Sequence, residues 1–555
     1  MRKLLIILVL LLTPLAFAQD LYIANSANWQ NIYSAGLYSA LNGKDFKFLV
    51  SAKHTEILIN EIPRDPIKIT VIESDRVPYV KRYANRLASA GHNTDTILIS
   101  EETGNLDLAK KLTQVDDYII VNPVFGYDAI SAAPLATKTN SYVLFATPDN
   151  INELTAFFDE TPPANITIIG DIEETVKKEL SKYNPRTIDE GNRFSNNIAL
   201  AEEFREKFKS EQAILTNGEF LENDVFFAGK TNQPIIFIGK DRIPTASENY
   251  IKTSPYKVFV VLGNDLFGSA QLVKEQSGKP VLIKFAKGTT NAGGYRSVQG
   301  LDIYPTPQLE LLLSLEAIFY NADKGRVDMI IRNEKTARTF ATSSIIIQDQ
   351  TTPIVTLGDN NAERLSGFEV RTLSYPEDLS EYTTKNLTAQ LIVSYGESQD
   401  TIEKALTATV PLPIVSEQNL CDLDITRATY NEKTQRFQIS VTTNKPCYTR
   451  VTLTDLTVND TQINAQSEVT YVDGKQNVEI KQRMDSVDIA DNPNLNVNAR
   501  FGSEQKILIK EINKTFPFKT EMTISIPIII GSLAITLLAT LITLALWKRK
   551  SKQQH

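Results

Sequence analysis

The chain has 555 residues, of which 42% are hydrophobic and 22% are charged, and its formal net charge at pH 7 is −8. This length allows several domains of ~100–200 residues each, and the acidic balance gives no sign of the basic face that nucleic-acid binding needs. The chain has three histidines and two cysteines, it has no Gly-x-Ser-x-Gly motif, and no Gly-Lys-Ser/Thr follows its glycine-rich loop at 288–294. It therefore lacks the residue patterns that a zinc finger, a hydrolase triad or a phosphate-binding loop requires. We predict a protein that is not an enzyme, with no catalytic residues, no metal and no cofactor.

The N-terminus has the pattern of a secretory signal peptide. Arg2 and Lys3 precede an apolar run at 4–12, and Ala16-Phe17-Ala18 has the small-x-small form of a cleavage site. We predict a signal peptide at 1–18. The alternative is an uncleaved N-terminal anchor, which the shortness of the apolar run disfavours.

One pattern of residues occurs three times before residue 290. Asn31-Ile32-Tyr33 matches Asp128-Ala129-Ile130 at an offset of 97, and Asp224-Val225-Phe226 follows at a further offset of 96. Each copy alternates short apolar runs with helical segments, which predicts parallel strands buried on both faces and joined by right-handed crossovers. A fixed period is typical of arrays that bind or scaffold. The modules of this predicted triplicated α/β repeat array with parallel sheets are 19–74, 75–191 and 192–290.

These residues resemble the cell wall-binding repeat 2 family, which occurs in triplicate in prokaryotic surface and S-layer-type proteins. The resemblance is carried by Asp128-Ala129-Ile130, by the strand Pro234-Ile235-Ile236-Phe237, and by Asp75-Arg76-Val77 and Asn192-Arg193-Phe194, which match an Asp-Arg-Tyr opening before a helix. The resemblance covers about half of the chain. It implies three modules that pack into one compact unit and bind anionic polymers of the cell wall.

Five residues are candidates for contact with such a polymer. Asn31, Asp128 and Asp224 share one repeated position at a strand-to-helix turn, where a polar group faces a polymer; alternatively they are helix N-caps, for which Asn and Asp are preferred. Arg76 and Arg193 carry the guanidinium fork that suits phosphate or carboxylate groups; alternatively they bridge adjacent modules through ion pairs.

The pattern changes after the modules. Pro305 and Pro307 indicate an extended linker at 291–310, because a proline disfavours helix in the residue before it. Short strand-like runs with polar turns then predict two β-sandwich domains of immunoglobulin-like class, at 311–412 and 417–516.

Two kinds of covalent modification are expected in the part of the chain outside the cell. Cys421 and Cys447 are candidates for one disulfide. Four Asn-x-Thr triplets are permissive for N-glycosylation, and their acceptors are Asn165, Asn386, Asn459 and Asn513.

The C-terminal region has the pattern of a membrane anchor. The run 524–547 contains no charged residue and exceeds the ~20 apolar residues that span a bilayer, so we predict a transmembrane helix at 523–547. Lys548-Arg549-Lys550 follow directly, and the positive-inside bias places the tail 548–555 in the cytoplasm. We predict a single-pass protein of the cell membrane with its N-terminal ectodomain outside.

Together these features predict a non-enzymatic cell-surface protein whose modules bind or tether an envelope polysaccharide, a glycan or a surface-layer protein, with the sandwiches as a stalk. No nucleic-acid partner is expected. The alternative is a receptor-like solute-binding ectodomain, because crevices at the carboxyl ends of parallel strands are natural ligand sites. An enzyme such as a glycan hydrolase is the least favoured hypothesis.

Overall fold

The structure, a computed structural model, describes residues 20–63, 67–286, 288–290, 298–382, 385–416, 420–458 and 461–520. The predicted signal peptide, transmembrane helix and cytoplasmic tail lie outside these ranges. Within them, no helix combines the length and the apolar character needed to cross a bilayer. The chain divides into two compact units, of which the first is Met1–Glu310 with Ser394–Ala405 and the second is Leu311–Val393 with Leu406–His555.

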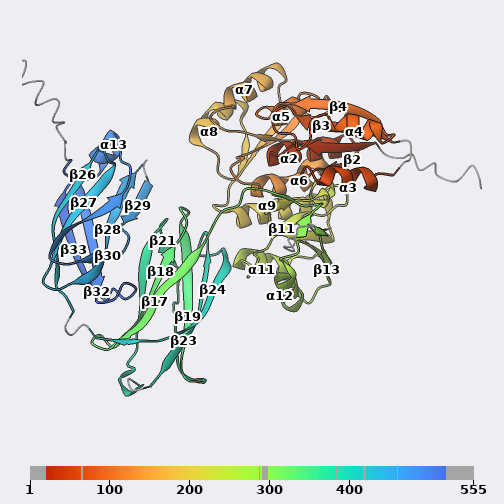
Figure 1. Cartoon of the computed structure of the whole chain (residues 1–555). Helices are drawn as coiled ribbons and strands as arrows, with labels where there is room; N and C mark the ends of the chain where they lie inside the picture. The colour runs from red at the N-terminus through yellow and green to blue at the C-terminus, as the bar shows by residue number, and fades with distance from the viewer. Residues whose placement is uncertain are drawn as a thin grey trace, which may run out of the picture. The chain divides into compact units, whose positions relative to one another are not determined.

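Three four-stranded parallel sheets form the framework of the first unit (Figure 1). Their strands are β1 (Leu21–Asn25), β2 (Asp45–Phe48), β3 (Lys68–Ser74) and β4 (Asn93–Ile99); β5 (Asp117–Val121), β6 (Tyr142–Phe145), β7 (Asn165–Ile169) and β8 (Arg186–Ile188); and β9 (Gln212–Thr216), β11 (Ile235–Phe237), β12 (Val258–Leu262) and β13 (Val281–Lys284). All three sheets have the same order, β2-β1-β3-β4, β6-β5-β7-β8 and β11-β9-β12-β13. The prediction of parallel α/β layers in this half of the chain is confirmed.

Helices connect the parallel strands, as crossovers in such sheets require. They are α2 (Trp29–Leu41), α3 (His54–Glu61), α4 (Tyr83–Ser89), α5 (Gly104–Ala109), α6 (Tyr127–Thr139), α7 (Ile151–Glu160), α8 (Glu174–Leu180), α9 (Arg193–Phe208), α10 (Asn223–Phe227), α11 (Thr245–Thr253) and α12 (Phe267–Ser277). The first strand of each sheet is buried along most of its length, because it lies between two other strands.

The helices that follow β1, β5 and β9 pack against one another and join the three sheets into one core. The hydroxyl of Tyr33 in α2 donates a hydrogen bond to the backbone oxygen of Ala129 in α6, at 2.6 Å. The ring of Phe226 in α10 lies 5.6 Å from the ring of Tyr33, centroid to centroid. Buried residues of α2, α6 and α10 belong to the same hydrophobic cluster, and the first and third sheets each have a further cluster of their own, so the modules share part of their interior.

The first sheet extends beyond the first predicted module boundary, whereas the second predicted boundary falls between the second sheet and α9. We placed the first boundary between residues 74 and 75, yet β4 pairs with β3 along its whole length, so the first sheet extends to Ile99. Most residues of β4 are at least partly exposed, since it is an edge strand. An edge strand with polar residues lacks the continuous apolar run from which the other strands are recognised.

The second unit is built mainly from antiparallel strands (Figure 1). Its first part contains the sheets β22-β18-β17-β25 and β20-β19-β23-β24, with β21 pairing with β19. The strands are β17 (Leu313–Asn321), β18 (Arg326–Asn333), β19 (Thr339–Asp349), β20 (Thr352–Gly358), β21 (Glu363–Leu365), β22 (Val370–Pro376), β23 (Leu387–Gly396), β24 (Ile402–Pro411) and β25 (Ile414–Val415). The tips of β23 and β24, within Ser394–Ala405, belong to the first unit.

Two further sheets enclose the last core of the second unit. They have the orders β26-β27-β31 and β29-β28-β32-β33, with β30 pairing with β28. The strands are β26 (Leu423–Asn431), β27 (Arg436–Thr443), β28 (Cys447–Val458), β29 (Thr461–Gln466), β30 (Thr470–Val472), β31 (Lys475–Lys481), β32 (Asn494–Gly502) and β33 (Lys510–Pro517), with the helix α13 (Ser486–Asp491). Ile439 of one sheet and Val451 of the other are fully buried in the same cluster, so the sheets pack face to face.

Candidate binding clefts of the first unit

The shared strand order of the three sheets gives each of them a switch point at the same place. In each sheet the second strand lies on one side of the first strand, whereas the third and fourth strands lie on its other side. The connections that leave the first and third strands therefore run to opposite sides of the sheet. Ligands of open parallel sheets bind at such a switch point, outside the carboxyl ends of the strands. Two clefts of the first unit lie at the switch points of the third and second sheets, and another lies beside β6 of the second sheet; we call them cleft 1, cleft 2 and cleft 3.

Cleft 1 has a volume of about 820 Å³ and lies beyond the carboxyl ends of β9 and β12, where the loop after β1 also reaches it. Four aromatic residues line it, namely Trp29, Tyr79, Phe220 and Tyr304. The polar lining consists of Glu219, Asn264, Asp265 and Gln308. Tyr304 is held in place because its hydroxyl meets that of Tyr79 at 3.3 Å and its strand pairs with the strand of Phe220.

Cleft 2 has a volume of about 370 Å³ and lies at the corresponding point of the second sheet. It brings together Asp128 from the first turn of α6 and Arg193 from the first turn of α9, two of the five predicted residues. Asp171, Asp189 and Glu397 complete its charged lining. Four carboxylates therefore face a single guanidinium group in this cleft.

The guanidinium group of Arg193 is already neutralised within the first unit. It donates hydrogen bonds to Glu397, at 3.0 Å, and to Glu403, and it lies 4.4 Å from the ring centre of Tyr127. Burial lowers the pKa of Arg193, but the adjacent Glu403 and Glu397 outweigh this effect and raise it. Arg193 thus stays charged, and both of its terminal nitrogens are occupied by protein carboxylates.

The carboxyl group of Asp128 titrates close to neutrality. Its burial raises the pKa to about 7, the nearby charges of Asp189 and Glu397 act in the same direction, and Arg193 opposes them. Burial also raises the pKa of Glu397, against the effect of Arg193. Both carboxyl groups therefore hold their protons more tightly than usual, because the cleft is partly desolvated and carries excess negative charge.

Cleft 3 has a volume of about 430 Å³ and lies beside the carboxyl end of β6. Its charged lining is again acidic and consists of Glu102, Asp149 and Glu153. Asn105 of α5 forms part of its wall. The amide of Asn105 donates to the backbone oxygen of Val143 at 3.0 Å and accepts from the backbone nitrogen of Phe145 at 3.0 Å, which fixes α5 against β6.

The other three predicted residues lie outside the clefts. Asn31 is 2% exposed and packs below the surface, against Gly104. Asp224 forms an ion pair with Lys284 at 2.8 Å. Arg76 forms an ion pair with Glu102 at 2.5 Å, beside cleft 3. Arg193 pairs with the segment Ser394–Ala405 and not with a neighbouring module, whereas the partner of Arg76 lies just beyond the first sheet, before α5.

Two of our interpretations of these positions are wrong. Asn31, Asp128 and Asp224 lie inside the first turn of their helices, whose N-cap residues are Asn28, Gly126 and Glu222, so none of the three is a cap. Asp75-Arg76-Val77 and Asn192-Arg193-Phe194 are also not equivalent. The former follows the third strand of its sheet, whereas the latter begins the helix after the fourth strand.

Sequence reasoning missed a second repeated position, occupied by Asn105 and Asn197. The amide of Asn197 donates to the backbone oxygen of Ile235 at 3.0 Å and accepts from the nitrogen of Phe237 at 2.7 Å, as Asn105 does in the second sheet. Each also donates to a serine of a central helix. The signal for this pair was an offset of 92 between the two asparagines, which differs from the offset of 96 between the second and third copies of the repeat.

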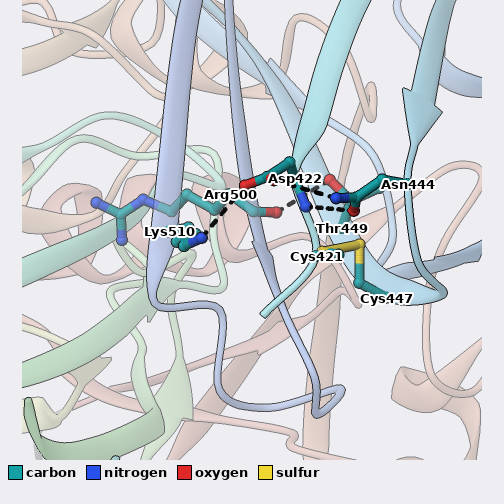
Figure 2. Close-up of a disulfide and its surroundings, with 7 residues drawn as sticks. All are labelled: Cys421, Asp422, Asn444, Cys447, Thr449, Arg500 and Lys510. Carbon is teal, nitrogen blue, oxygen red and sulfur yellow. Dashed lines mark hydrogen bonds and ion pairs between the residues drawn. A yellow bond between two sulfur atoms is a disulfide. The ribbon is translucent and has the colours of Figure 1, made fainter. Parts of the chain in front are cut away.

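The candidate modification sites are placed as follows. Cys421 and Cys447 are bonded, with 6.2 Å between their Cα atoms, at one end of the last core (Figure 2). The adjacent Asp422 accepts a hydrogen bond from Asn444, at 3.1 Å, and lies 3.4 Å from the ammonium group of Lys510. The glycosylation candidates Asn165, Asn386 and Asn513 are exposed, and Asn459 lies outside the described residues. No group of described residues has the composition and spacing of a metal site.

Comparisons with known proteins give partial similarity. No family model matches the chain. The amidase enhancer of Bacillus subtilis (strain 168) is 30% identical over 156 residues, which cover 26% of this chain and 21% of that protein. The chain thus matches about a fifth of the length of that relative.

Among solved structures, Cwp6 from Clostridium difficile aligns with a TM-score of 0.36 and 12% identity over 48% of this chain and 42% of its own. The YadV chaperone aligns with a TM-score of 0.14 and 9% identity over 38% of this chain and all of its own. TM-scores this low establish no shared fold. The specific resemblance to the cell wall-binding repeat 2 family stays a prediction.

Proposed function

We propose that this protein is a non-enzymatic cell-surface protein whose first unit binds or tethers a polymer of the cell envelope, such as a glycan or a surface layer. The supporting observation is cleft 1, a cavity of about 820 Å³ at a switch point, with aromatic walls and several hydrogen-bonding side chains. This combination is typical of a binding site for an organic ligand. The partial similarity to an amidase enhancer supports a role at the cell wall at a coarse level.

The location that we propose follows from the ends of the sequence. A secretory signal at 1–18 would export the chain, and the apolar run at 523–547 would hold it in the membrane with both units outside. The strands of the second unit would then serve as a spacer between the bilayer and the first unit.

The pKa shifts in cleft 2 do not divide its carboxyl groups into an acid and a base. An acid–base pair needs two groups whose surroundings push their pKa values apart. The pKa values of Asp128 and Glu397 are both raised, first by burial, and then by Asp189 and Glu397 for Asp128 and by Glu403 for Glu397. We therefore assign neither of them a catalytic role.

The test uses full-length protein purified in a mild detergent. It is mixed with insoluble envelope fractions from the cells that make it, namely peptidoglycan, wall polysaccharide and surface-layer protein, and then sedimented. We expect the protein to sediment with at least one fraction and to stay in solution without it. Failure to bind any fraction would contradict the proposed function.

The size of cleft 1 also favours a second candidate, a receptor-like protein that binds a solute. Its volume falls within the range of small-molecule sites, which is ~300–1,000 Å³. A thermal-shift screen of the same protein against small metabolites separates the two candidates. A ligand that raises the melting temperature, together with no binding to any envelope fraction, would favour the receptor.

A further inference from the structure

We propose that cleft 1 binds an uncharged, hydroxyl-rich saccharide chain and not an anionic polymer, an assignment that rests on the proposed function and names the chemistry of its ligand. The resemblance to known wall-binding repeats implied the opposite, a polymer with negative charge. Three properties of the described residues carry the assignment: the aromatic walls of cleft 1, the nature of its polar groups, and the sign of the charge in all three clefts.

The aromatic walls of cleft 1 suit the apolar face of a sugar ring. Tyr79 and Phe220 are partly exposed, so their rings are accessible from the cavity, whereas Trp29 and Tyr304 are under a tenth exposed and form its buried wall. The C–H groups on one face of a pyranose form a flat apolar surface. Such a surface packs against an aromatic ring through dispersion and through the negative potential of the ring face.

The polar groups of cleft 1 suit hydroxyl groups. Glu219 and Asp265 offer carboxylate oxygens, and Asn264 and Gln308 offer amide groups. A hydroxyl donates to a carboxylate in a charge-assisted hydrogen bond, which is stronger than a neutral one. Glu219 is positioned for this role, because one of its oxygens accepts a hydrogen bond from Asn217 at 2.9 Å and holds the side chain in place.

The charge of cleft 1 disfavours an anion. Among the described residues that line it, there are two carboxylates and no lysine or arginine. Lys240 is 3.6 Å from Asp265 and is compensated by it. A phosphate or carboxylate in the cavity would therefore meet repulsion from Glu219 and Asp265 in a partly desolvated setting, where charges interact more strongly than in water.

The charged residues that line the other two clefts are also mainly acidic. Cleft 3 has three carboxylates and no lysine or arginine among its described lining residues. Cleft 2 has one arginine, but Glu397 and Glu403 occupy its terminal nitrogens. A long anionic chain that crossed the first unit from cleft to cleft would thus find no unpaired cation in the described lining of any of them.

The experiment separates polysaccharide by charge. Envelope polysaccharide from the cells that make the protein is released and split by anion exchange into a neutral and an anionic fraction, and each fraction is titrated into full-length protein in mild detergent. We expect the neutral fraction to bind with an affinity that barely changes between low and high salt, because screening weakens only charge attraction.

Two variants locate the binding in cleft 1. Phe220→Ala should weaken binding of the neutral fraction by roughly tenfold, as truncation of an aromatic contact does at binding sites. Gln308→Ala should weaken it by about fivefold through the loss of one hydrogen bond, and this side chain is exposed, so folding does not depend on it. Phe267→Ala is the matched control, because Phe267 is 54% exposed in the same module and lines none of the three clefts.

The possible outcomes are distinct. Binding of the anionic fraction alone, or neutral binding that neither Phe220→Ala nor Gln308→Ala weakens, would overturn the assignment and leave the proposed function standing. Binding of neither fraction, with no sedimentation on any envelope material, would instead overturn the proposed function itself. Equal melting temperatures of the variants and the wild type show that a loss of binding is not a loss of folding.

Discussion

At the scale of single residues, neighbours that are distant in the sequence decide what a repeated position does. Asn31, Asp128 and Asp224 share one place in the repeat, yet one is buried, one lines a cleft and one is paired with a lysine. Asp128 differs from the others because Asp189 and Glu397 lie near it. Glu397 comes from a segment more than 200 residues further along the chain, which no local pattern can connect to Asp128.

The raised pKa of Asp128 predicts a pH-dependent effect of its replacement. The group has a pKa of about 7 in the folded protein and an ordinary value of 3.8, so the folded state holds the proton more tightly. Its contribution to stability is complete below a pH of 3.8, where the unfolded chain is also protonated, and is lost progressively as the pH rises from there to about 7. Asp128→Asn mimics the protonated form, so it should raise the melting temperature by less at pH 5 than at pH 8.

This prediction is checked by melting curves of the wild type and of Asp128→Asn across pH 5 to 8. Glu222 also has a pKa raised to about 7 by burial, so the wild-type curve alone reports more than one group, whereas the difference between the two proteins isolates Asp128. A difference in melting temperature that does not grow with pH would show that Asp128 is not protonated in the folded protein at pH 5.

At the scale of elements, close contact between the central helices decides how the modules assemble. A β-carbon at Gly36 in α2 would lie 2.6 Å from the ring of Phe226 in α10. A β-carbon at Gly229 would lie 2.2 Å from the backbone oxygen of Pro134 in α6. Small residues at these points let the three helices approach closely enough to share one core.

Gly36→Ala should therefore destabilise the first unit, although alanine is the better helix former. Overpacking a core costs ~1–3 kcal/mol, and the gain in helix propensity offsets about 1 kcal/mol of it. Gly268→Ala in α12 is the matched control, because a β-carbon there would meet no atom within 4 Å. The control should raise stability by up to about 1 kcal/mol in urea unfolding. Equal effects of the two variants would mean that the contact with Phe226 does not constrain the assembly.

The strands also show which parts of the fold can be predicted from the sequence. Buried strands such as β5 and β9 were predicted from their apolar runs, because both faces of such a strand are covered by helices. The edge strand β4 was not assigned to the first sheet, since its exposed residues give no such run. The clefts were anticipated only as crevices at strand ends. Their acidic lining depends on side chains from several loops and was not predicted.

At the scale of the whole molecule, the chain forms two compact units, and the one disulfide lies in the second. Cys421 and Cys447 are separated by 26 positions in the sequence. Closing a loop of this length restricts the unfolded chain and stabilises the fold by about 3 kcal/mol. The first unit contains neither cysteine and should not respond to reduction.

The double variant Cys421→Ser/Cys447→Ser tests this division. Calorimetry should show a transition that moves to lower temperature, assigned to the second unit, and another that stays in place. Wild-type protein in the presence of a reducing agent is the control and should behave like the variant. A single transition that moves as a whole would show that the two units unfold together.

The sequence by itself determined the alternation of strands and helices, the threefold repeat of the first unit and the β-rich character of the second, because these depend on local hydrophobic patterns. The tertiary structure alone decided which predicted residues reach a cleft, that Arg193 is neutralised by Glu397 and Glu403, and that the lining of the clefts is acidic. The physical reason is distance. Charge and desolvation act between side chains within a few ångströms of each other, whatever their separation along the chain.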